Sequence, residues 1–118
     1  MAMQIPKDAV LLRVFIGEDD KAGHLPLYEA IVLKARNMHL AGATVLRGAV
    51  GFGRSARLHT AKIMRLSQDL PIVIEIVDAE DRINAFLPEL EKLMAKESSL
   101  VTLEKANVLR YGKGADGG

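Results

Sequence analysis

The sequence predicts an α+β fold, a ferredoxin-like plait in which a four-stranded antiparallel sheet carries two helices on one face. Four strand-like runs occur at residues 9–17, 43–50, 70–77 and 100–109, and side chains alternate between two faces in the first and the third. Stretches of helical periodicity separate the first run from the second and the third from the fourth. Right-handed crossovers then place both helices on the same side of the sheet.

The first predicted strand alternates between two faces, one of which presents Val10, Leu12, Val14 and Ile16. A polar loop follows at residues 18–23. Pro26 is a predicted helix start, because its fixed φ and missing N–H are tolerated in the first turn. Helical spacing then relates the apolar residues Leu27, Ile31, Ala35 and Met38. Gly42 is the predicted left-handed stop just past this helix.

The second half repeats the pattern with different boundaries. The near-continuous β-branched run at 70–77 predicts a central strand that is buried on both faces. Asp78 is the predicted cap of the following helix. Pro88 interrupts the apolar stripe of that helix, so we expect a kink near Asn84 or two short helices that meet there.

Composition bounds the class of protein. A chain of 118 residues is expected to form one domain, here residues 1–111, followed by a disordered Gly-rich tail at 112–118. The net charge of +1 excludes a globally basic nucleic-acid binder, and the absence of cysteine excludes disulfides and thiolate metal sites. No signal-peptide layout and no membrane-length apolar run are present, so we expect a cytoplasmic protein.

The second face of the predicted sheet is also apolar. Leu11, Phe15, Val73 and Val77 lie on the face that the two helices leave uncovered. An uncovered apolar sheet face indicates a partner, most simply another copy of the chain.

A glycine-rich segment with flanking cations follows the second predicted strand. No Asp or Glu occurs at residues 30–68, although the chain holds 15 carboxylates. Because backbone N–H groups at glycines can approach a phosphate closely, this segment predicts an anion site. The candidate ligand-binding residues are Arg47, Gly48, Gly51, Gly53, Arg54, Arg57, Glu75 and Arg110.

Other interpretations of these residues stay open. The glycines are also explained by a bulged or sharply turned strand end. Residues 48–55 match the P-loop pattern with Arg54 in place of lysine, but the residues that follow make a poor core-facing helix. Glu75, in the most apolar strand, needs a partner, and Arg13 and Arg47 are the natural candidates for an ion pair.

Four blocks of sequence, at residues 16–20, 26–30, 43–53 and 66–78, carry a resemblance to a known family. Over residues 10–109 the chain resembles an uncharacterised family of bacterial and archaeal PII-like proteins. The resemblance implies a PII-like plait assembled as a homotrimer, with the sheets packed around the threefold axis. It also implies that the long loop at about 51–69 corresponds to the PII T-loop, the flexible element that docks onto partners and responds to ligand.

Two departures from PII signal transducers are visible. The segment 51–69 has no tyrosine to modify, and the turn at 95–99 lacks the glycines of the PII phosphate-holding turn. A bound nucleotide would therefore take more of its anion contacts from residues 48–57. By the same resemblance, Arg110 and Tyr111 could reach the cleft of a neighbouring subunit.

The function expected from these features is that of a non-enzymatic signalling protein. It would bind a small anionic effector such as ATP, ADP or AMP in clefts between subunits, with no metal and no nucleic acid. A partner, by resemblance a membrane transporter or channel, would dock on Phe52, Arg54, Arg57, His59, Lys62 and Arg65. Two alternatives are a nucleotide hydrolase that uses Glu75 or Asp69 with His59, and a structural interaction module without a ligand.

Overall fold

The computed structural model describes residues 7–52, 59–60, 69–95 and 97–113. Its elements are β1 (Asp8–Gly17), β2 (Lys21–Ala22), β3 (Leu25–Pro26), α1 (Leu27–Asn37), β4 (Thr44–Arg47), β5 (Val50–Gly51), β6 (His59–Thr60), β7 (Pro71–Asp78), α2 (Glu80–Met94) and β8 (Leu100–Asn107).

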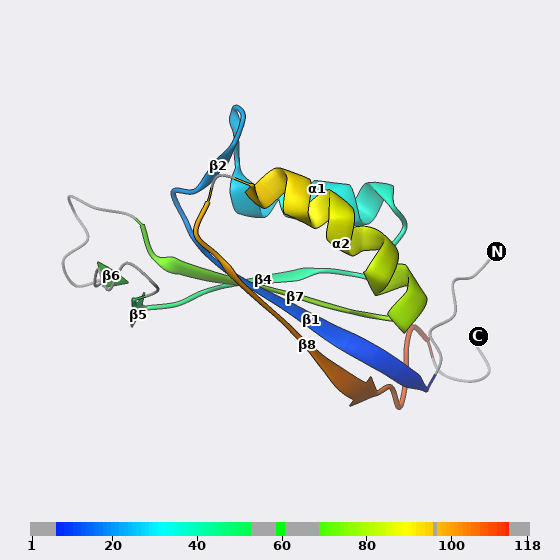
Figure 1. Cartoon of the computed structure of the whole chain (residues 1–118). Coiled ribbons are helices and arrows are strands. Elements are labelled where there is room, and N and C mark those ends of the chain that lie inside the picture. The colour runs from blue at the N-terminus through cyan, green and yellow to red at the C-terminus, as the bar shows by residue number, and fades with distance from the viewer. Residues whose placement is uncertain (1–6, 53–58, 61–68, 96, 114–118) are drawn as a thin grey trace.

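The main sheet has the strand order β4-β7-β1-β8, and all three pairings are antiparallel. The helices α1 and α2 lie side by side over one face of this sheet (Figure 1). This arrangement confirms the predicted ferredoxin-like plait. The predicted central strand is β7, which lies between β1 and β4, and β8 forms the other edge.

The hydrophobic core lies between the helices and the sheet. The alternation in β1 and β7 directs one set of side chains toward the helices, and those residues are buried. Each large side chain that leaves water in this way stabilises the fold by about 1.5–3 kcal/mol. The core residues with less than 2% exposure include Phe86, Leu12, Leu27, Ile31, Ile72, Ile74, Ile76, Ile83, Leu90 and Val14.

The end of α1 differs from the prediction. The left-handed residue is His39, with φ of 61°, and Gly42 has no positive φ. The Leu40 N–H donates to Ala35 O and the His39 N–H to Arg36 O, each at 3.0 Å. This pair of bonds is the Schellman arrangement, which satisfies the last carbonyls of the helix three residues before Gly42. The Gly42 prediction was therefore wrong.

The structure differs from the prediction for α2 in two respects. The helix runs unbroken from Glu80 to Met94 with Pro88 inside it, so the alternative of two short helices was wrong, while a kink near Asn84 stays a prediction. Its buried stripe holds it together across the missing N–H of Pro88. Asp78 does not cap it: the N-cap is Ala79, without a side-chain capping bond, because the Asp78 carboxylate has other partners.

Several boundaries moved. The predicted polar loop at 18–23 contains β2, which pairs with β3 just beyond that loop in a small hairpin, and the predicted second strand is divided into β4 and β5 at Gly48. The predicted loop at 51–69 contains the hairpin partner β6, since Val50 pairs with Thr60. Among the described residues, no helix is long and apolar enough to cross a membrane.

Candidate functional site

The glycine-rich segment begins at the stem where β4 leaves the sheet. The Gly48 N–H donates to Pro71 O at 2.7 Å. A Cβ added at either Gly48 or Gly51 would lie 3.0 Å from Pro71 Cγ. These two glycines therefore let the chain approach β7 closely, as the interpretation of a sharply turned strand end required.

Arg47, a predicted phosphate contact, already has a partner. Its Nη2 lies 2.5 Å from Glu18 Oε2. The Glu18 N–H also donates to Leu70 O at 2.8 Å, and the Asp19 N–H donates to Asp69 Oδ1 at 3.0 Å. The acidic turn after β1 thus binds both sides of the loop stem, and a phosphate would have to compete with Glu18 for the Arg47 guanidinium.

The acidic turn is closed by a third carboxylate. The Gly17 N–H donates to Asp20 Oδ2 at 2.9 Å. Burial raises the pKa of Asp20 above its ordinary value; the bond from Gly17 opposes this, whereas the nearby carboxyls of Glu97 and Asp69 add to it. Three carboxyl groups, those of Asp20, Glu97 and Asp69, therefore lie close together at this side of the stem.

The remaining predicted loop residues are placed only in part. Gly53, Arg54, Arg57, Lys62 and Arg65 lie outside the described residues, and only the backbone of His59 is described. Within the described residues, Val50 and Gly51 pair with the strand at 59–60, a β-ladder contact that differs from the strand-to-helix arrangement of a P-loop. Phe52 is 70% exposed at the start of the loop.

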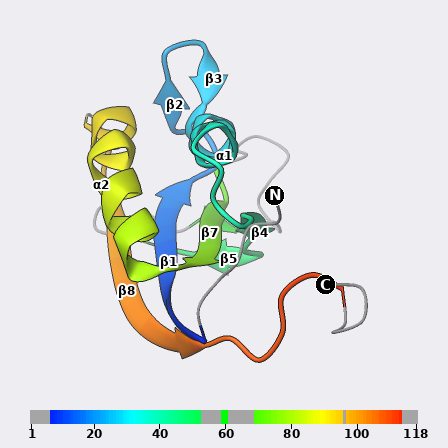
Figure 2. The same cartoon turned by 90° about the vertical axis from the view of Figure 1, so that its right-hand side faces the viewer.

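A pocket of about 580 Å³ lies at the opposite end of the sheet, on the face without helices. Figure 2 shows the segment after β8 passing from the β8 edge toward the β4 side. This segment forms one wall, residues 41–44 form another, and the sheet forms the floor. The lining residues are Leu11, Ala41, Gly42, Ala43, Thr44, Glu75, Val77, Ala106, Asn107, Val108, Leu109, Arg110 and Tyr111.

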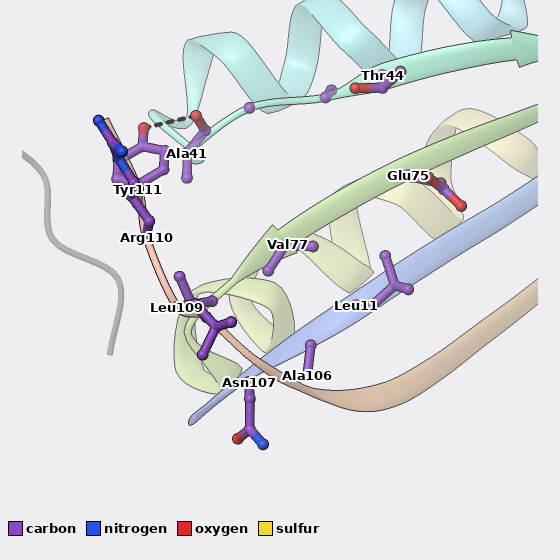
Figure 3. A pocket seen from close by; sticks show the side chains of 13 residues that line it. Leu11, Ala41, Thr44, Glu75, Val77, Ala106, Asn107, Leu109, Arg110 and Tyr111 are labelled. Carbon is purple, nitrogen blue, oxygen red and sulfur yellow. Dashed lines mark hydrogen bonds between the residues drawn. The ribbon is translucent and has the colours of Figure 1, made fainter. Parts of the chain in front are cut away.

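The pocket brings together two predicted ligand-binding residues that are far apart in sequence. Figure 3 shows Glu75 and Arg110 at opposite ends, with Leu11 and Val77 between them. The Arg110 side chain forms no hydrogen bond or ion pair with any other described residue. The arrangement thus offers an available cation, an apolar floor and a carboxylate to one ligand.

Glu75 forms the predicted ion pair, and its partner is Arg13. The Arg13 Nε donates to Glu75 Oε2 at 2.9 Å, and its Nη1 lies 2.5 Å from Glu104 Oε1. The bond to Glu75 is the main cause of the raised pKa of Arg13. The same three groups lie on adjacent strands of the open face, because Arg13 pairs with Glu75 across β1 and β7.

One wall of the pocket is fixed by a hydrogen-bond chain that the sequence did not reveal. The Tyr111 hydroxyl donates to Ala41 O at 2.8 Å (Figure 3), and the Ala41 N–H donates to Asp78 Oδ2 at 2.9 Å. Asp78 is fully buried and also accepts from the Ala79 N–H and from Arg82 Nε. Arg82 donates in turn to His39 O.

Sequence reasoning missed the wall at residues 41–44. The only signal was the run of small residues Ala41-Gly42-Ala43, which leaves space beside the sheet. Tyr111, which was expected to reach a neighbouring subunit, donates a hydrogen bond to Ala41 of its own chain. No group of three or more His, Cys, Asp or Glu side chains with metal-binding geometry occurs in the described part of the chain.

The family is decided by a match over most of the chain. Residues 9–108 match the DUF190 family, described as "Uncharacterized ACR, COG1993". The chain belongs to this family. It is 36% identical over 99 residues to a UPF0166 protein of Aquifex aeolicus, which covers 84% of this chain and 91% of the relative. It is 32% identical over 102 residues to a UPF0166 protein of Methanocaldococcus jannaschii, covering 86% and 93%.

Solved structures with the same fold are PII-like proteins, as the sequence resemblance predicted. CPII of Thiomonas intermedia K12, a nitrogen regulatory PII-like protein bound to ADP, AMP and bicarbonate, superposes with a TM-score of 0.67 at 16% identity, covering 92% of this chain and 94% of CPII. A putative PII-like signalling protein of Thermus thermophilus gives a TM-score of 0.62 at 16% identity, covering 86% and 89%. This member of the DUF190 family therefore has the PII-like fold.

Proposed function

We propose that this DUF190 protein is a non-enzymatic PII-like regulator that binds a small anionic effector, an adenine nucleotide, in the pocket on the open face of its sheet. The observation that carries the proposal is the convergence of Arg110, Glu75 and an apolar floor in one pocket. The description of CPII as bound to ADP and AMP supports the choice of nucleotide by analogy of fold.

The pairing of the arginines favours the pocket over the loop stem as the site that binds an anion. Arg47 is paired with Glu18, whereas Arg110 has no partner within the described residues. A phosphate at Arg110 gains a charge-assisted hydrogen bond without displacing a carboxylate. A volume of about 580 Å³ also falls in the ~300–1,000 Å³ range of sites for small molecules.

A homotrimer would place this pocket at a subunit boundary. The open face carries an apolar row across all four strands, formed by Leu46, Val73, Phe15 and Leu100. Leu46 and Leu100 are exposed in the single chain, and a neighbouring copy would cover them. A ligand in the pocket would then contact two subunits, which links binding to the assembly.

The loop is the proposed output of the regulator. Phe52 is exposed, and the predicted docking residues Arg54, Arg57, His59, Lys62 and Arg65 follow it in the sequence. An exposed aromatic residue followed by cations suits a docking segment for an acidic partner, and we propose a membrane transporter or channel with a cytoplasmic face in that role.

Titration of the protein with ATP, ADP and AMP tests the proposal. The chain has no Trp and only two Tyr, so a Tyr28→Phe protein reports on Tyr111 alone by its tyrosine fluorescence. We expect saturable binding near one nucleotide per chain, with a change in that fluorescence, and at least tenfold weaker binding in Arg110→Ala. Arg36→Ala is the matched control, because Arg36 is an exposed cation on the helix α1.

Two results would contradict this assignment. Absence of binding by every adenine nucleotide would remove the effector. Binding that is unchanged in Arg110→Ala but weakened tenfold by Arg47→Ala with Arg54→Ala would move the effector site to the loop stem.

A further inference from the structure

The two ends of the pocket differ in what they can accept. Arg110 offers only donors, and the Glu75 carboxylate offers only acceptors. Leu11 and Val77 lie between these ends and form a floor with no polar side-chain atoms (Figure 3). A ligand that crosses this floor therefore meets a cation at one end and an acceptor at the other.

The Glu75 carboxylate is held in a fixed orientation with one oxygen left over. Its Oε2 accepts from Arg13 Nε at 2.9 Å. Its Oε1 has no hydrogen-bond partner among the residues that the structure describes. Thr44, its neighbour in register on β4, also lines the pocket. The remaining oxygen is thus an oriented acceptor that a ligand can reach, since the Glu75 side chain is 32% exposed.

We propose that the pocket binds its nucleotide in one direction, with the phosphate at Arg110 and an exocyclic amine of the base at Glu75, so that Glu75 selects bases that carry an amine. This inference rests on the proposed function and deepens it. The N6 amine of adenine donates to a carboxylate oxygen. Hypoxanthine carries a carbonyl oxygen at the same position, so two acceptors would face each other.

The expected preference for bases with an amine depends on the strength of the hydrogen bond between that amine and the Glu75 carboxylate. A bond to a charged group contributes enough to change an equilibrium by roughly tenfold or more. Because Glu75 is partly exposed, water compensates for some of the loss, and we expect the lower end of that range. AMP should therefore bind about tenfold more tightly than IMP, and CMP about tenfold more tightly than UMP, whose bases differ by the same exchange of amine for carbonyl.

Calorimetric titration of the full chain with AMP, IMP, CMP and UMP measures the selection. In Glu75→Gln the AMP-to-IMP ratio should fall to within about twofold, because an amide both donates and accepts. Glu104→Gln is the matched control: it removes the other carboxylate bound to Arg13, and Glu104 does not line the pocket. The ratio should stay near tenfold in Glu104→Gln.

Each outcome decides between distinct conclusions. Equal binding of AMP and IMP to the unaltered protein overturns the role of Glu75 and leaves nucleotide binding intact. A ratio that survives in Glu75→Gln does the same. If no nucleotide binds to the unaltered protein, the proposed function fails together with this inference. The CMP and UMP titrations need no variant, so the test stands even where Glu75→Gln folds poorly.

Discussion

The two ends of the sheet are both fastened by aspartate and glutamate side chains, but in physically different ways. At the pocket end, Asp78 is fully buried and accepts from two backbone N–H groups and Arg82. At the loop stem, Glu18, whose side chain is 19% exposed, pairs with an Arg47 side chain that is 54% exposed, and Asp69 accepts from the N–H of the exposed residue Asp19.

The difference separates a rigid frame from an adjustable one. Removing a buried carboxylate that accepts from three donors costs much free energy, because each donor then has neither its hydrogen-bond acceptor nor water in its place. Exposed ion pairs contribute only about 0–1 kcal/mol, since water replaces either partner. The wall of the pocket therefore stays in place while the loop stem can change its contacts, which suits a binding site at one end and a responsive loop at the other.

The largest expected effect is at Asp78. Replacing Asp78 by Ala removes the acceptor of the Ala41 and Ala79 N–H groups and of the Arg82 guanidinium. The free energy of unfolding should fall by about 3 kcal/mol. Denaturant unfolding measures the loss. Asp81→Ala is the matched control, because Asp81 is exposed in the first turn of the same helix and should cost less than about 1 kcal/mol. Equal losses would show that the pocket end is not the more firmly held.

The next effect tests why glycines occupy the stem. Gly48→Ala places a Cβ 3.0 Å from the Pro71 ring, which cannot swing aside, and should destabilise the protein by about 1–2 kcal/mol. The loss should shrink when Pro71 is also replaced by Ala. Gly42→Ala provides the control, because nothing lies within 4 Å of its Cβ position and its φ is not positive. If Gly48→Ala left the stability unchanged, close packing against Pro71 would not explain these glycines, and ligand contact would remain as their role.

A smaller effect is expected for the ion pair at the stem. A double-mutant cycle of Glu18→Gln and Arg47→Ala should give a coupling energy below about 1 kcal/mol that decreases as salt is added. Thermal unfolding at low and high ionic strength measures it. A coupling above about 2 kcal/mol, insensitive to salt, would mean that the stem is fastened as firmly as the pocket.

The smallest effect concerns Asp20, and its sign is opposite. Burial raises the pKa of Asp20, so the folded state binds that proton more tightly than the unfolded state does. The charged carboxylate therefore costs stability above the folded pKa, and the cost disappears below the unfolded value. Asp20→Asn, whose amide oxygen still accepts from the Gly17 N–H, should stabilise the protein by roughly 0.5 kcal/mol at pH 7 and by nothing at pH 3. Chemical unfolding at both pH values checks this, and a loss of stability at pH 7 would refute it.

The sequence predicted the plait, the uncovered sheet face and an ion pair of Glu75 with Arg13 or Arg47, because each is encoded in strand alternation and charge placement; the structure decided for Arg13. Sequence reasoning placed the anion site on the glycine-rich segment, because a motif of neighbouring residues can be recognised in a sequence. A site built from residues far apart in the chain cannot be recognised in this way. Proximity in the chain could not show that Glu18 holds Arg47. The Gly42 stop failed for a related reason, since the hydrogen bonds at His39 and Leu40 end the helix earlier.

The sequence by itself determined the order of the four sheet strands and two helices, the uncovered apolar face of the sheet and the family, since these follow from periodicity and from blocks of residues read along the chain. Only the tertiary structure decided which charges are paired and which are available. It brought Glu75 and Arg110, 35 positions apart in the printed sequence, to one pocket. The physical reason is that pairing depends on which side chains the strand register and the course of the segment after β8 bring within reach, and neither is a local property of the chain.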